Sequence, residues 1–170
     1  MKVQVEYKDR ISPSLRRSLR KMSDRRPVLE AMGLELESYT KRAFNMEGLR
    51  VLPWAPVKKA EGAPLKRSGM LWQSIRVVSV SNTDVVVGTD RLYAAVHQLG
   101  GRPHVIRARN AKALYWPGAK HPVVKVNHPG VPARPFFPFI GDQMSDQAKS
   151  GIEKVARAKI RSILGGQVAR

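Results

Sequence analysis

The chain contains no cysteine among its 170 residues. This absence excludes disulfide scaffolds, thiol catalysis and zinc sites built on cysteine. The sequence also lacks the run of roughly 18 or more apolar residues that a membrane-spanning helix needs. We therefore expect a fold stabilised by packing, with neither signal peptide nor membrane span, that forms in the cytoplasm.

Acidic residues are scarce: the chain has 13 Asp and Glu but 31 Lys and Arg. These counts give a formal net charge of +18. A field of this sign raises the local concentration of nucleic acid or of acidic protein surfaces. The alternative is that the charge serves solubility alone. Self-repulsion of this size costs stability unless a partner neutralises it, so we expect a polyanion nearby.

The sequence shows no arrangement that would support catalysis or hold a cofactor. Its acidic residues stand singly among basic ones, whereas hydrolytic and nucleolytic sites cluster them. His121 and His128 have no nearby carboxylate to complete a metal site, and His97 accompanies no nucleophile signature. Gly100 and Gly101 lack the Lys and Ser or Thr of a phosphate-binding loop. We predict no enzymatic activity, no cofactor and no metal.

Two amphipathic helices are predicted, one in each half of the chain. Apolar residues recur at steps of three and four from Val28 to Met46, so a long helix should begin near Pro27. The same spacing from Asp142 to Ile163, with Lys and Arg at the other positions, predicts a C-terminal helix.

Strands are predicted in two hairpins. Residues 75–80 and 85–87 are β-branched runs on either side of a turn, and residues 113–116 and 123–126 are expected to form a second hairpin. Residues 93–99 predict a short helical or bent segment. The expected fold class is α+β, with a mainly antiparallel sheet, in a single domain of residues 1–170.

Two segments interrupt this pattern. Residues 1–22 form a basic N-terminal segment, and residues 47–69 are rich in proline and glycine without periodicity, which predicts a long loop. Loops of this length in compact domains are usually functional, so this one is expected to order against a neighbour. Trp54 would then be its anchor, and the alternative is packing on the domain's own surface.

Residues 102–126 form a basic hairpin region in which Tyr115 and Trp116 stand among the charges as stacking groups. Such a region contacts either phosphate groups or the acidic face of a protein neighbour, and the sequence leaves both open. The predicted basic surface consists of Arg102, Arg107, Arg109, Lys112, Lys120 and Lys125.

Residues 131–139 contain three prolines, so they are expected to form an extended connector and no regular element. Phe136, Phe137 and Phe139 are candidates for a partner or oligomer interface, or equally for the core beneath the last helix. Arg134 is a candidate for a bidentate pair, and we favour a role in orienting the connector.

Three motifs in this order resemble the phage virion-morphogenesis or tail-completion family. They are residues 65–75 (LKRSGMLWQSI), residues 87–89 (VGT) with 93–101 (YAAVHQLGG), and residues 132–136 (PARPF). Residues 127–130 (NHPG) also resemble head-to-tail connector proteins. The resemblance covers most of the chain.

The resemblance implies a structural virion protein that completes or terminates the tail and joins it to the head. The expected partners are other copies in a ring of about six subunits, the tail tube, neck or connector proteins, and passing phage DNA. The expected location is the tail or neck of the virion, after assembly in the bacterial cytoplasm. The alternative function is a free, non-specific nucleic-acid-binding protein.

Overall fold

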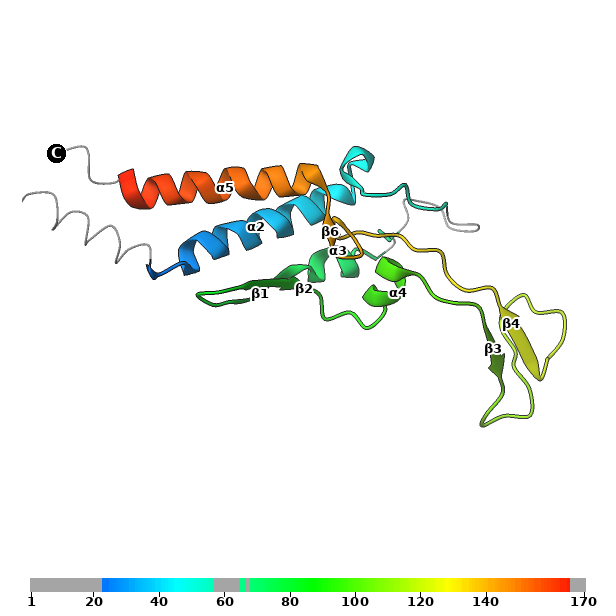
Figure 1. Cartoon of the computed structure of the whole chain (residues 1–170). Coiled ribbons are helices and arrows are strands. Elements are labelled where there is room, and N and C mark those ends of the chain that lie inside the picture. Colours follow the sequence, from blue (N-terminus) through cyan, green and yellow to red (C-terminus); the bar gives the residue numbers. More distant parts are fainter. Residues whose placement is uncertain (1–22, 57–64, 67, 166–170) are drawn as a thin grey trace, which may run out of the picture. The chain divides into compact units, whose positions relative to one another are not determined.

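The computed structural model describes residues 23–56, 65–66 and 68–165 (Figure 1). The predicted N-terminal segment 1–22 and residues 57–64 of the predicted loop lie outside the described residues. The contacts group into two compact units, and the prediction of a single domain stays a prediction. The described part of unit 1 comprises residues 23–39, 75–88 and 146–165, and that of unit 2 comprises the remainder.

The described part of unit 1 consists of two helices and a hairpin. Helix α2 (Arg26–Ala43) begins where the Asp24 carboxylate accepts a hydrogen bond of 3.1 Å from the Arg26 N–H, and its last residues belong to unit 2. Helix α5 is the C-terminal helix (Asp146–Gly165), and it lies beside α2 (Figure 1). Strands β1 (Arg76–Val80) and β2 (Val85–Gly88) pair antiparallel, with a register irregularity between Val77 and Ser79.

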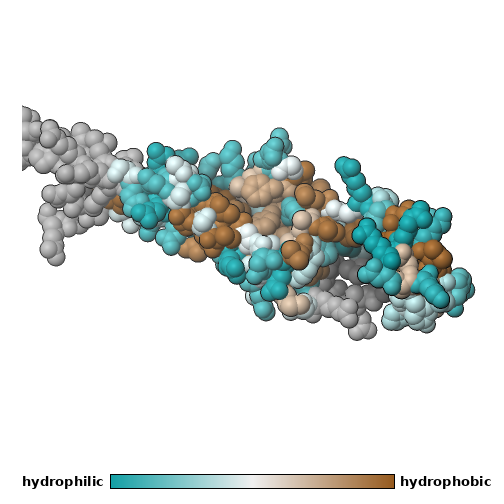
Figure 2. All heavy atoms as spheres, turned by 90° about the horizontal axis from the view of Figure 1, so that it is seen from below, coloured by the Kyte–Doolittle hydropathy of each residue, from teal (hydrophilic) through white to brown (hydrophobic). Residues whose placement is uncertain are grey.

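One face of the β1–β2 hairpin packs closely on α2. A Cβ built on Gly33 would lie 2.5 Å from Val85 Cγ2 and 3.3 Å from Val77 Cγ2, so only glycine allows this approach. The Val77 N–H donates to Glu37 Oε2 of α2 at 2.9 Å. The opposite face carries the exposed Val78 and Val86, and Figure 2 shows it in brown.

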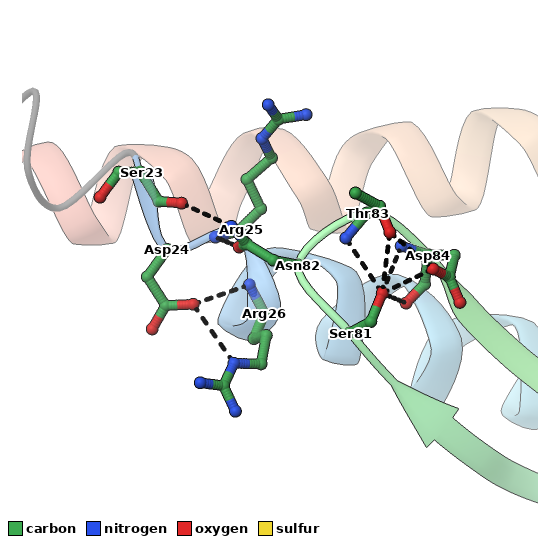
Figure 3. A network of polar contacts seen from close by, with 8 residues as sticks. All are labelled: Ser23, Asp24, Arg25, Arg26, Ser81, Asn82, Thr83 and Asp84. Carbon is green, nitrogen blue, oxygen red and sulfur yellow. Dashed lines mark hydrogen bonds and ion pairs between the residues drawn. The ribbon is translucent and has the colours of Figure 1, made fainter.

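Polar contacts tie the hairpin turn to the start of α2 (Figure 3). Asn82 accepts from the Arg25 N–H at 2.6 Å and donates to the Ser23 carbonyl at 2.9 Å. Within the turn, hydrogen bonds from Ser81 and Thr83 lower the pKa of the Asp84 carboxyl. The turn is therefore held by two sets of hydrogen bonds, one within the turn and one to the start of α2.

Unit 2 surrounds an aromatic core. Phe44 meets Trp54 edge-on at a centroid distance of 5.3 Å and lies 5.8 Å from Phe136, and all three rings are buried. Its described residues form the elements η1 (Glu47–Leu49), α3 (Met70–Ser74), α4 (Ala94–Leu99), β3 (His104–Arg107), β4 (Lys125–His128), β5 (Phe139–Ile140) and β6 (Gln143–Met144).

The α+β prediction is confirmed, and so are both long helices and the first hairpin. Among the described residues, no helix is long and apolar enough to cross a membrane. The predicted pairing of 113–116 with 123–126 is wrong, because only Leu114 and Val123 form a bridge there. The hairpin instead pairs β3 with β4, since the β-branched Val105 and Ile106 lie opposite Asn127 and Val126.

One boundary and one further element differ from the prediction. The last helix begins at Asp146, because Gln143 and Met144 pair with residues 140 and 139 in the β5–β6 hairpin. Residues 70–74 form the short helix α3, which the sequence analysis did not predict.

The close approach at Gly33 predicts opposite outcomes for two glycines in helices. Gly33→Ala should destabilise the chain by about 1–3 kcal/mol, because the new methyl group overlaps the stiff Val85 side chain. Gly151→Ala in α5 has only a 3.4 Å contact with the Glu35 carboxylate, so it should gain up to about 1 kcal/mol from helix propensity. Urea unfolding of both variants measures the difference. A Gly33→Ala variant as stable as the parent would show that the hairpin does not pack on α2 in this way.

Candidate functional site

The connector 131–139 is held by the side chain of Gln98 on α4. Gln98 Oε1 accepts hydrogen bonds of 3.0 Å from the N–H groups of both Phe136 and Phe137. Its amide nitrogen lies 3.5 Å and 3.4 Å from the carbonyl oxygens of Phe137 and Phe139. The Gln98 side chain thus makes the hydrogen bonds that a neighbouring strand would otherwise make, because the prolines prevent regular strand pairing of the connector.

Arg134 fastens the same connector to the chain on two sides. Its backbone N–H donates to the His97 carbonyl at 2.7 Å. Its guanidinium donates to the carbonyl oxygens of Ala55 at 2.8 Å and Pro56 at 3.3 Å. Because Arg134 is only 9% exposed, these contacts orient the connector from within unit 2.

Two glycines let the chain segments before and after the basic region approach closely. Gly101 and Val131 form a bridge with two hydrogen bonds of 2.9 Å. A Cβ on Gly130, whose φ is +88°, would lie 2.3 Å from the Gly101 carbonyl oxygen. This contact explains why glycine is required at the base of the hairpin.

Trp54 is anchored inside unit 2. Its indole N–H donates to the Pro135 carbonyl at 2.8 Å, and the Arg50 guanidinium lies 4.0 Å from its ring centroid. Arg50 is itself held by the carbonyl oxygens of Ala43 and Phe44. The described start of the predicted loop is therefore packed on the chain's own core.

These contacts bear on the five residues predicted at an interface. Trp54, Arg134 and Phe136 are buried within unit 2, and Phe137 and Phe139 are half-buried. The packing favours the alternative that Trp54 packs on its own domain and the core alternative for Phe136, and an interface role for the five stays a prediction. Sequence reasoning missed Gln98, although it lies in the YAAVHQLGG motif.

Residues 102–128, which include strands β3 and β4 and the residues between them, form a basic arm. It contains six basic residues and no acidic one. The structure places all six predicted basic residues at exposed positions, and Tyr115 is 68% exposed. In Figure 2 the arm shows hydrophilic and hydrophobic residues side by side.

Like groups face each other across this arm. Arg107 is paired directly with Lys125, and His104 with His128, whose rings lie 5.0 Å apart. Directly opposed like charges destabilise an antiparallel pair. An anion placed across Arg107 and Lys125 would remove this cost.

His97 is a partly buried titratable group whose pKa is changed by its surroundings. Burial, together with the nearby Arg134 guanidinium, lowers the pKa of His97 from its ordinary value of 6.5. Its Nδ1 atom is buried and has no hydrogen-bond partner among the described residues. The Tyr93 ring meets the His97 ring edge-on, with the ring centroids 5.7 Å apart.

The described residues present an exposed basic arm and several exposed apolar side chains. In the part of the chain that the structure describes, no three His, Asp or Glu side chains are grouped to hold a metal ion. Exposed basic and apolar side chains are typical of a protein that works through contacts with other macromolecules.

The model of the phage virion morphogenesis family matches residues 7–168, and the chain belongs to this family. The chain is also 28% identical over 102 residues to the Mu-like prophage FluMu G protein 2 of Haemophilus influenzae, covering 60% of this chain and 72% of that protein. No solved structure matches. The predicted resemblance is confirmed, and the chain has a role in phage structure and assembly.

The position of Gln98 predicts a large effect from one side-chain truncation. Gln98→Ala leaves the N–H groups of Phe136 and Phe137 without acceptors, which should destabilise the chain by about 2 kcal/mol or more. The exposed Gln143→Ala serves as the control and should change stability by less than about 0.5 kcal/mol. Equal urea midpoints for the two variants would contradict the role of Gln98.

The lowered pKa of His97 predicts that acid weakens the fold. The unfolded chain binds a proton near pH 6.5 more readily than the folded chain, so stability is present above that pH and falls as the pH decreases through the folded pKa. His97→Gln should reduce the difference between urea midpoints at about pH 8 and about pH 5.5, while the exposed His121→Gln should leave it unchanged. An undiminished pH dependence in His97→Gln would exclude His97 as its source.

Proposed function

We propose that the chain is a non-enzymatic subunit of a closed ring that completes or terminates the phage tail and joins it to the head. The observation that carries the proposal is the match to the virion morphogenesis family over residues 7–168, nearly the whole chain. The order of the three sequence motifs supports the finer assignment to tail completion. The location is then the tail or neck of the virion, with assembly in the bacterial cytoplasm.

A ring needs each subunit to carry two different complementary surfaces, because a heterologous contact that closes by rotation never pairs a surface with itself. Exposed apolar side chains occur in both units, among them Val78 and Val86 in unit 1 and Leu92 and Leu99 in unit 2. This distribution supports a subunit with more than one contact surface. The expected partners are other copies, the tail tube, and neck or connector proteins.

The basic arm has a distinct part in this proposal. Its opposed Arg107 and Lys125 favour a site for an anionic group, either a carboxylate of a protein neighbour or a phosphate of passing DNA. The exposed Tyr115 and Trp116 support a second candidate function, which is non-specific nucleic-acid binding by stacking and charge.

Electron microscopy of the purified chain mixed with tail tubes tests the ring proposal. We expect a ring at one end of the tube, with rotational symmetry of order about six. A chain that stays monomeric at high concentration in the presence of tail proteins would contradict the proposal. A monomer that binds DNA with an affinity falling steeply with salt would instead favour the nucleic-acid-binding function.

The variant Arg107→Glu separates the role of the arm from its stability. It converts a repulsive cross-strand pair into an attractive one, so the folded chain should keep its stability. Binding to the anionic partner should weaken. Lys154→Glu makes the same charge change at an exposed position on α5 and is the matched control. Equal weakening by both variants would show that only the net charge matters.

A further inference from the structure

Helix α4 exposes an apolar stripe on the side that does not hold the connector. Leu92 is 97% exposed and Leu99 is 77% exposed, and Ala95 and Val96 are exposed between them. Leu99 is three residues from Val96 and four from Ala95, so these three side chains share one face of α4, and Leu92 lies in the turn just before the helix. Ala94 and Gln98 occupy the packed side, so the usual orientation of an amphipathic helix is reversed here.

The stripe lies in an electrically neutral stretch of a strongly basic chain. Residues 89–101 contain one acid, Asp90, and one base, Arg91, which form an ion pair of 3.3 Å. The remaining surface carries the excess that makes the chain +18. Two copies repel each other at most of their surfaces, and a neutral apolar stripe is where a second copy can approach without that repulsion.

Unit 1 contains an apolar groove between α2 and α5. Val28 and Leu29 of α2 and Ile160, Ile163 and Leu164 of α5 line it, with Asp24 and Arg25 also in its wall. Its volume is about 250 Å³, below the roughly 300–1,000 Å³ usual for small-molecule sites. A groove of this size fits a few apolar side chains better than a cofactor.

We propose that the α4 stripe of one copy docks into the α2–α5 groove of the next copy. The inference rests on the proposed ring and identifies its two complementary surfaces. Helix α5, which forms one wall of the groove, carries more basic than acidic residues. Because the stripe is apolar and neutral, it can enter the groove without like-charge repulsion. Because stripe and groove are different surfaces, the contact is heterologous and can continue from subunit to subunit until the ring closes.

The cysteine-free chain allows a direct test by cross-linking. A chain carrying both Leu99→Cys and Ile163→Cys is mixed with tail tubes, treated with a copper–phenanthroline oxidant in air, and analysed on a denaturing gel. The proposal predicts a ladder of dimers, trimers and higher oligomers, because each copy is linked to two neighbours. The control pairs Leu99→Cys with Ser150→Cys, an exposed position on α5 outside the groove, and should give no ladder.

The outcomes separate this inference from the proposed function. Dimers formed by Leu99→Cys alone would indicate that the stripe contacts itself, and a link from Ile163→Cys to another tail protein would assign the groove to that protein. Either result overturns the inference. Rings seen by microscopy without the ladder would leave the proposed function intact and refute these surfaces, whereas no association in either assay refutes both.

The variant Leu99→Asp adds an independent readout. The side chain is exposed, so the isolated chain should keep its unfolding midpoint, while ring formation on tail tubes should be lost. Normal rings from this variant would overturn the proposed contact.

Discussion

The hydrogen bonds between Gln98 and the connector are the interaction on which unit 2 depends. Three prolines leave the connector without the N–H groups for a regular ladder, yet Phe136 within it is buried. A buried backbone group without a partner is costly, so Gln98 must satisfy both Phe136 and Phe137. The aromatic core of Phe44, Trp54 and Phe136 can form only when the connector is held in this position.

This constraint also explains the surface of α4. The helix uses its polar Gln98 and the His97 carbonyl to bind the connector, so these groups lie on the packed side. The apolar residues of the same helix are therefore left on the opposite side. A short helix that buries its polar atoms and exposes Val96 and Leu99 is better suited to an assembly than to an isolated chain.

Much of the fold follows from the sequence. The spacing of Val28 to Met46 predicts α2, and the valines around the 81–84 turn predict the β1–β2 hairpin, because periodicity depends on local geometry. The β3–β4 register was missed, since Val123 to Val126 has the same β-branched character as Val105 and Ile106 and local preference does not choose between partners.

The candidate site was harder to predict than the elements. A glutamine carries no sequence signal for a hydrogen bond across 38 residues, and the core position of Trp54 depends on the Pro135 carbonyl, 81 residues away. The basic residues of the arm lie at exposed positions, because charged side chains are rarely buried without partners. What the arm contacts depends on a partner whose chemistry the chain alone does not define.

Our central proposal is that this member of the virion morphogenesis family joins tail to head as a structural subunit. Electron microscopy of lysates from a phage in which this chain is not produced tests the claim most directly. The account predicts filled heads and separate tails without rings at their ends, and joined particles once the chain is supplied again. Joined, infectious particles at normal yield in the absence of the chain would contradict it.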